Sequence, residues 1–161
     1  MHFDLATHRA VLRHGRFRAT AVLALALSLV ACATGPKFTA PETPPPGTGR
    51  VYVYRPFKLI GGVGHHVYVD SSNDALSLPN ASWLQLDLSP GAHSIRIEDL
   101  FGVMQCGSVG LNVQAGEVAY VVDNVNTTQG LNRLYVSCAV VRQTEEQAKP
   151  EITGLSEKRK D

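Results

Sequence analysis

Short β-type runs separated by turn residues fill the middle of this 161-residue chain, from Arg50 to Arg142. They are rich in Val, Ile, Leu and Tyr, and cover residues 50–55, 66–70, 75–78, 82–88, 92–98, 108–113, 117–123 and 133–141, with 75–78 the weakest. No window offers an apolar stripe at i, i+3, i+4 and i+7 that is long enough for a core helix. Seven or eight short strands with frequent turns predict an all-β fold, a small antiparallel β-sandwich over residues 50–142.

Two neighbouring runs, 82–88 and 92–98, alternate apolar and polar side chains, as expected of strands with one wet face. Between them, Pro90 and Gly91 meet the requirements of the two central positions of a type II turn. The sequence therefore predicts that these two strands form an antiparallel hairpin.

The first 31 residues have the features of a targeting signal. A leader with four arginines precedes an uncharged apolar run of eleven residues, Ala21 to Ala31. As a helix this run is only ~16 Å long, too short for the ~30 Å hydrocarbon core of a bilayer. We expect residues 1–31 to be a signal peptide that is removed.

A cysteine directly follows this apolar run. The sequence Leu29-Val30-Ala31-Cys32 resembles the lipobox of bacterial lipoproteins, in which the cysteine thiol is acylated and the chain is cut just before it. The resemblance implies a lipid anchor at Cys32, and Ala33 in place of Asp favours the outer membrane of a Gram-negative cell, facing the periplasm. The alternative is an ordinary buried cysteine after a signal of a soluble secreted protein.

Proline-rich and charged segments flank the predicted strands. Residues 33–49 hold five of the nine prolines, and with Cys32 they predict an extended linker that reaches up to ~50 Å at ~3.1 Å per residue. The tail, 143–161, predicts a short helix over 144–149 and disorder past Pro150.

Four segments carry a likeness to a known family. They are GRVYVYRP from Gly49, VYVD from Val67, LDLSPGAHSIRI from Leu86 and VQAGEVAYVV from Val113. In order and spacing they resemble the bacterial envelope family catalogued as domain of unknown function 2846, over residues 49–142. The resemblance implies a lipoprotein with a small PEGA-like β-sandwich and no assigned activity. The longer turn that begins at Asp70 departs from the family pattern, so the resemblance does not fix the local register.

Two cysteines remain if Cys32 is lipidated. In an exported domain an even number of thiols predicts a disulfide between Cys106 and Cys138, across neighbouring strands or between two sheets. Free buried cysteines and a catalytic thiol are the alternatives. No catalytic signature surrounds either residue.

Histidines and glycines give no recognisable site of chemistry. On a strand His65 and His66 would point to opposite faces, and a histidine pair in a surface loop is the simpler interpretation. We expect His93 to be a hydrogen-bonded side chain on the inner face near a turn. Neither a metal-binding motif nor a phosphate-binding loop in the right context is present, so no catalytic residue, metal or cofactor is predicted.

The charge distribution argues against a nucleic-acid partner. Beyond residue 31 the formal charge is −2, which leaves no basic excess.

Tyr52 and Tyr54 share one face of their strand. They either pack inside the sandwich or form an exposed aromatic strip that docks an envelope protein strand or a cell-wall glycan. We therefore expect a lipid-anchored, non-enzymatic envelope binding or structural module. The alternative is an envelope hydrolase or metal-dependent enzyme with an unrecognised site.

Overall fold

A computed structural model describes residues 35–59 and 63–158. The predicted signal peptide and Cys32 lie outside the described residues. Within the described ranges, no helix is both long enough and apolar enough to cross a bilayer.

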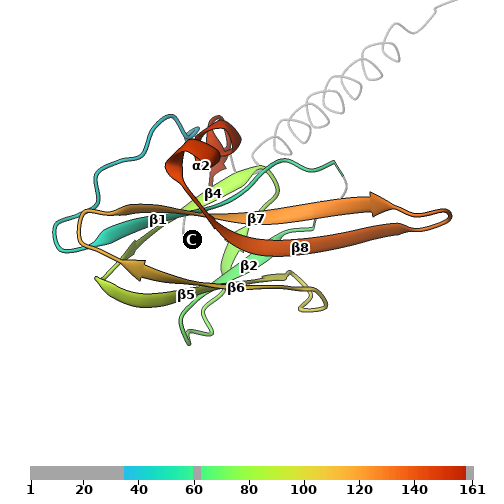
Figure 1. Ribbon diagram of the computed structural model, residues 1–161, viewed down its shortest axis with the longest axis horizontal. Helices are drawn as coiled ribbons and strands as arrows, with labels where there is room; N and C mark the ends of the chain where they lie inside the picture. The colour runs from blue at the N-terminus through green and yellow to red at the C-terminus, as the bar shows by residue number, and fades with distance from the viewer. Residues whose placement is uncertain (1–34, 60–62, 159–161) are drawn as a thin grey trace, which may run out of the picture. The chain divides into compact units, whose positions relative to one another are not determined.

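The described chain is mostly β, with two sheets and one short helix (Figure 1). Its strands are β1 (Gly49–Arg55), β2 (His65–Val69), β3 (Leu76–Leu78), β4 (Ser82–Leu88), β5 (Gly91–Asp99), β6 (Gln105–Val113), β7 (Val118–Gln129), β8 (Leu134–Gln143) and β9 (Ser156–Glu157). The helix, α2 (Glu145–Ile152), lies between β8 and β9 in the sequence. All eight predicted runs form strands, and β4 has the predicted bounds.

The strands form a five-stranded sheet of order β8-β7-β1-β4-β9 and a four-stranded sheet of order β3-β2-β5-β6. Most neighbours are antiparallel, but β1 pairs with β7 in parallel and β4 pairs with β9 in parallel. The expectation of a purely antiparallel arrangement is therefore wrong at these two pairs.

Apolar side chains from both sheets meet in one core. The five-stranded sheet contributes Val51, Val53, Leu84, Leu86, Ala119 and Val121, and the four-stranded sheet contributes Val67, Leu78, Ile95, Ile97, Cys106, Leu111 and Val113. These residues alternate along their strands with side chains that point to the opposite faces. The two sheets are thus held together by burial of their facing apolar sides.

A second core covers the other face of the five-stranded sheet, where α2 lies (Figure 1). Tyr52 and Tyr54 are only 1% and 0% exposed there, and the Phe38 ring packs edge-on against both Tyr52 and Trp83. The prediction of an exposed tyrosine strip that docks a partner is therefore wrong. The sequence missed the cover because it comes from segments outside the predicted strands, the helix and the chain around Phe38.

The predicted hairpin between β4 and β5 is also wrong, because the two strands belong to different sheets. Strand β4 pairs with β1 along one edge and with β9 along the other, while β5 pairs with β2 and β6. Gly91 is the first residue of β5 and has a φ of 141°, a backbone conformation that favours glycine, but it does not form the predicted type II turn. The turn leads the chain from one sheet to the other.

The C-terminal segment is more ordered than predicted. Thr144 caps α2 with a capping box: its hydroxyl accepts from the Gln147 amide, and the Gln147 side chain accepts from the Thr144 amide. The helix runs past Pro150 to Ile152, and β9 then pairs with the start of β4. The short helix is confirmed, whereas the expected disorder past Pro150 is wrong for residues 151–158.

The proline-rich segment is not a free spacer over its described part. Phe38 is 4% exposed, its amide donates to the Leu155 carbonyl, and Lys37 forms a β-bridge with Ser156. The Glu42 amide then donates to the Tyr52 hydroxyl. The expectation of an extended tether therefore fails from Gly35 onward, because the buried Phe38 ring and these hydrogen bonds hold the segment on the domain.

Candidate functional site

Three chain connections meet at one end of the two sheets. Because β1 and β7 run in parallel, the loop after Arg55 and the β7–β8 turn leave the five-stranded sheet at the same end. His65, the first residue of β2, pairs with Asp99, the last residue of β5. The Leu100 amide donates to the Gly64 carbonyl, which ties the loops together. We call the described parts of these connections, residues 56–59, 63–64, 100–104 and 130–133, together with the first three residues of β8, 134–136, the loop end.

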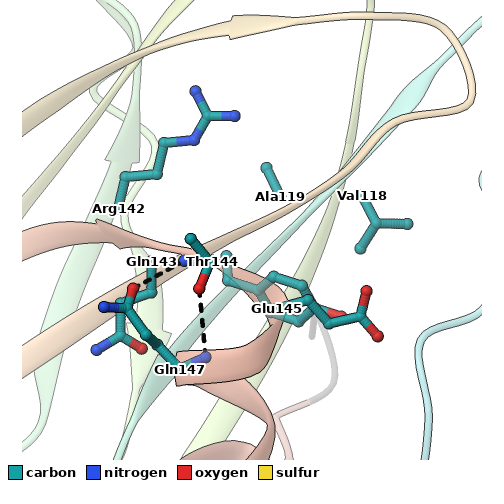
Figure 2. A pocket seen from close by; sticks show the side chains of 8 residues that line it. Val118, Ala119, Arg142, Gln143, Thr144, Glu145 and Gln147 are labelled. Carbon is teal, nitrogen blue, oxygen red and sulfur yellow. Dashed lines mark hydrogen bonds between the residues drawn. The ribbon is translucent and has the colours of Figure 1, made fainter.

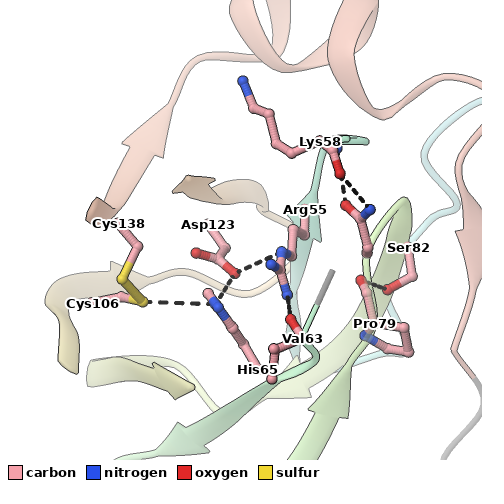
Figure 3. A network of polar contacts seen from close by, with 10 residues as sticks. Arg55, Lys58, Val63, His65, Pro79, Ser82, Cys106, Asp123 and Cys138 are labelled. Carbon is pink, nitrogen blue, oxygen red and sulfur yellow. Dashed lines mark hydrogen bonds and ion pairs between the residues drawn. A yellow bond between two sulfur atoms is a disulfide. The ribbon is translucent and has the colours of Figure 1, made fainter. Parts of the chain in front are cut away.

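Arg55 lies buried beneath this loop end, 0% exposed (Figure 3). Its Nη1 donates to the Val63 carbonyl at 2.6 Å, and its Nε lies 3.6 Å from Asp123 Oδ2. Burial lowers the pKa of the Arg55 guanidinium, and the Asp123 charge opposes that shift. Because a buried charge is costly without a partner, Asp123 is the group that permits Arg55 to stay inside.

His65 completes a buried polar network. Its Nδ1 lies 2.6 Å from Asp123 Oδ2, and both side chains are almost fully buried (Figure 3). The prediction that His65 and His66 form a surface loop pair is therefore wrong: both lie in β2, and His65 faces inward. Oδ1 of Asp123 has no hydrogen-bond partner among the described residues.

A disulfide closes the network on one side. Cys106 of β6 is bonded to Cys138 of β8, so the crosslink joins the four-stranded sheet to the five-stranded one. The predicted disulfide is confirmed, in its intersheet form. By the chain-entropy relation a loop of this length contributes ~3 to 4 kcal/mol to stability. The Cys106 sulfur lies 3.7 Å from His65 Nδ1.

His65, Cys106 and Asp123 bring their ligand-type atoms within 4.8 Å of one another. That separation suits a metal ion, but the donor set does not. The Cys106 sulfur is held in a disulfide and is not a thiolate, and the Arg55 guanidinium already faces the Asp123 carboxylate. As it stands, the network serves structure better than it would hold a metal.

Large apolar side chains gather on the loop end above this network. Those with high exposure are Phe57, Leu59, Val63, Leu100, Phe101, Val103, Leu131, Leu134, Tyr135 and Val136. Leu59, Val103 and Leu131 are 86%, 85% and 104% exposed. Val141 is the one other large apolar residue with high exposure among those that the structure describes. The exposed large apolar side chains of the described residues are thus concentrated at one end of the sheets.

The opposite end of the sheets is polar. His93 Nδ1 lies 2.8 Å from Asp70 Oδ2 and Nε2 lies 2.8 Å from the Ser89 carbonyl, so the expected hydrogen-bonded role of His93 is confirmed. Arg142 donates to Glu117 at the same end. The hydrogen bond to His93 lowers the pKa of Asp70, and the hydrogen bond to Asp70 raises the pKa of His93.

A hollow of about 410 Å³ lies beside the start of α2 (Figure 2). It is lined by Val118, Ala119, Tyr120, Arg142, Gln143, Thr144, Glu145 and Gln147. The polar groups of Thr144 and Gln147 form the helix cap, and Arg142 donates a hydrogen bond to Glu117. The hollow therefore offers few uncommitted polar groups to a ligand.

Sequence reasoning found the disulfide but not Arg55 or Asp123. A usable signal was present, because Arg55 continues the inward face of Val51 and Val53, and Asp123 continues that of Ala119 and Val121. A charged residue in register with a buried face predicts a buried ion pair.

Comparison with known proteins gives no relative for this chain. No protein-family model matches it, and no curated protein matches it. The resemblance to the envelope family of unknown function stays a prediction.

Proposed function

We propose that this chain is a lipid-anchored, non-enzymatic β-sandwich module of the bacterial cell envelope, which contacts its envelope partner through the loop end. In this proposal Cys32 carries the acyl chains, and the module faces the periplasm from the outer membrane. The observation that carries the binding role is the presence of ten exposed large apolar side chains at one end of the sheets, seven on the three connections and three at the start of β8.

Exposed apolar side chains favour binding to a partner, because binding removes them from water. Removing apolar side chains from water is favourable by roughly 25 cal/mol per Å², and monomeric proteins keep large apolar patches away from water unless they are used. Beneath the loop end, Arg55 binds the Val63 carbonyl, and its charge is balanced by Asp123. The network therefore supports the apolar loop from below.

The burial of the ionisable cluster supports a non-enzymatic role. His65 is 1% exposed and Asp123 is 0% exposed, so neither reaches a substrate in solution. Cys106 has no thiol to act as a nucleophile while its disulfide is intact. An envelope hydrolase or metal-dependent enzyme is the weaker alternative, because its candidate residues are already committed to one another.

The proposed anchor rests on the sequence Leu29-Val30-Ala31-Cys32 at the end of the apolar run and on the likeness to an envelope lipoprotein family. An acylated cysteine gains ~0.8 kcal/mol for each CH₂ group buried in a bilayer, so several chains hold a domain firmly. Ala33 favours the outer membrane within this proposal.

Metabolic labelling with palmitate tests the anchor. The wild-type chain should incorporate label, and Cys32→Ala should lose it and accumulate as an unprocessed precursor. A Cys32→Ala variant that keeps the label would place the anchor elsewhere and contradict the proposal.

Crosslinking in cells tests the binding surface. A photoreactive side chain at Leu131 should give crosslinks to an envelope component, whether lipid or protein, and one at Asn73, an exposed residue of the polar end, should give none. Equal yields from both positions would contradict a role for the loop end.

A further inference from the structure

The point at which the chain joins the domain limits how far the domain can stand from its anchor. The Glu157 amide donates to the Pro36 carbonyl at 2.9 Å, Lys37 bridges to Ser156, and Phe38 is buried. Two residues, Ala33 and Thr34, separate Cys32 from Gly35, and the three Cα–Cα steps from Cys32 to Gly35 span at most ~11 Å. If Cys32 is acylated, the domain is held close to the bilayer surface, far short of the ~50 Å that a free linker of this composition would allow.

The attachment point lies toward the loop end of the five-stranded sheet. Ser156 pairs with Ser82, and Ser82 pairs with Arg55, the last residue of β1. Lys37, which bridges to Ser156, therefore lies level with the point at which β1 leads into the loop end. The Pro36 carbonyl accepts from the amide of Glu157, which pairs with Trp83, so the chain joins the domain beside the first two residues of β4.

The two ends of the sheets differ in charge as well as in polarity. The segments 56–64, 100–104 and 130–136 contain no acidic residue and contribute two basic ones, Lys58 and Arg133. The connections at the opposite end, 70–75 and 114–117, carry Asp70, Asp74 and Glu117 and no basic residue. A surface of lipid phosphates would attract the first end through Lys58 and Arg133, whereas at the second end Asp70 and Glu117 are paired with His93 and Arg142.

The apolar side chains of the loop end sit on separate projecting connections. The β7–β8 hairpin extends beyond the other strands, because residues past Val122 in β7 pair with β8 alone (Figure 1). A rigid protein partner is favoured by a continuous, well-packed surface, whereas a fluid bilayer interface accepts separate side chains at different depths. Tyr135 is of a residue type that is enriched at membrane interfaces, and Phe57 and Phe101 offer large apolar side chains of a kind that interfacial helices bury among lipids.

From these observations we propose that the loop end inserts its apolar side chains into the interface of the same lipid bilayer that holds the acyl chains of Cys32. This inference rests on the proposed lipidation and names the partner of the loop end as a phospholipid surface. The anchor confines the domain near the bilayer, so that even a weak affinity of the loops for lipid keeps the domain docked in one orientation. The polar end, with Asp70 and Glu117, then faces the periplasm.

Tryptophan quenching by brominated lipids tests the orientation. The full chain, lipidated in cells, is reconstituted into vesicles of phosphatidylcholine and phosphatidylglycerol with bromine on the acyl chains. Phe101→Trp adds a reporter at the loop end, and Asn73→Trp adds a matched one at the exposed polar end. Wild-type protein supplies the baseline, because its single tryptophan, Trp83, is buried. Val103→Trp replaces Phe101→Trp if the latter changes the thermal midpoint.

We expect bromine to quench the added emission of Phe101→Trp, which should also shift to the blue, and to leave that of Asn73→Trp unchanged. Vesicle-bound protein with neither reporter quenched, or with both quenched alike, overturns the docked orientation and leaves the anchor intact. An unquenched Phe101→Trp reporter, together with a protein crosslinked to Leu131 in cells, assigns the loop end to a protein and overturns the lipid assignment. If mass spectrometry finds no acyl chains on Cys32 and the protein stays in the soluble fraction, the proposed function itself is overturned.

Discussion

At the scale of single residues, Arg55, Asp123 and His65 place polar side chains in an interior that is otherwise apolar. The Arg55 guanidinium faces the Asp123 carboxylate, with Nε 3.6 Å from Oδ2, so the two buried side chains are oppositely charged partners. The contact of Asp123 Oδ2 with His65 Nδ1 then fixes the start of β2 against β7. The network therefore stabilises the fold at the place where the three connections converge.

Asp123→Asn should destabilise the fold strongly, because it removes the Asp123 carboxylate charge that faces the buried Arg55 guanidinium. Removing one partner of a buried pair typically costs about 3 to 5 kcal/mol. Arg142→Gln, which breaks the exposed pair with Glu117, is the matched control and should cost less than about 1 kcal/mol. Urea unfolding of both variants measures the difference. A small loss for Asp123→Asn would mean that Arg55 reaches water or another partner.

The Asp70–His93 pair should stabilise the domain within a defined range of pH. The pKa of Asp70 is lowered, so its contribution is complete above its ordinary value of 3.8 and is lost as the pH falls through the folded-state pKa. The pKa of His93 is raised, so its contribution is complete below its ordinary value of 6.5 and is lost as the pH rises through the folded-state pKa.

The stability difference between wild type and His93→Gln should therefore be largest between pH 3.8 and 6.5 and shrink on both sides. Thermal unfolding of both proteins across this range provides the measurement, and Asp70→Asn should give a similar profile. A difference that grows steadily above pH 7 would contradict the assigned pair.

At the scale of elements, the strands follow from their own sequences but their partners do not. All eight runs were predictable, because alternation and turn residues are local properties. The assignment of β4 and β5 to one hairpin failed because an apolar face does not say which strand is the neighbour. The same alternation fits two strands that are paired in one sheet and two strands that face each other across the core. The cover on Tyr52 and Tyr54 was missed for a related reason. A single aromatic residue, Phe38, and a helix of eight residues give weak signals outside their tertiary context.

The disulfide should be a large part of the intersheet stability. The double variant Cys106→Ala with Cys138→Ala should lose ~3 to 4 kcal/mol, by the entropy of closing the loop between the two cysteines. Mass mapping of the non-reduced, proteolysed protein should first find the two peptides joined. Two freely alkylated thiols in the exported protein would contradict the crosslink.

Helix α2 should be required for the second core. Ile152→Ala removes a fully buried side chain and should cost roughly 2 to 5 kcal/mol, whereas Lys149→Ala on the exposed side of the same helix should be nearly neutral. Chemical denaturation of the two variants separates the cases. Equal small effects would mean that the helix only rests on the sheet without stabilising it.

At the scale of the whole molecule, the domain has one apolar end and one polar end, and the chain joins it toward the apolar end. The sequence predicted an envelope lipoprotein but placed its contact on the wrong residues, because alternation reports which side chains share a face and not which face is covered. The exposed loop residues could not be singled out from sequence, since an apolar side chain in a loop is as often buried beneath it. Only the folded structure shows which apolar loop residues are exposed and which are buried.

Amide hydrogen exchange on the full chain in native envelope membranes, compared with the same chain in detergent, tests the central claim most directly. The account predicts slower exchange in membranes for residues 57–59, 100–104 and 130–136, with no change for residues 70–75. This result is expected whether the loop end meets lipid or another envelope component. Equal exchange in both states at the loop end, or protection centred on residues 70–75 and 114–117, would contradict the claim that this module works through its apolar end.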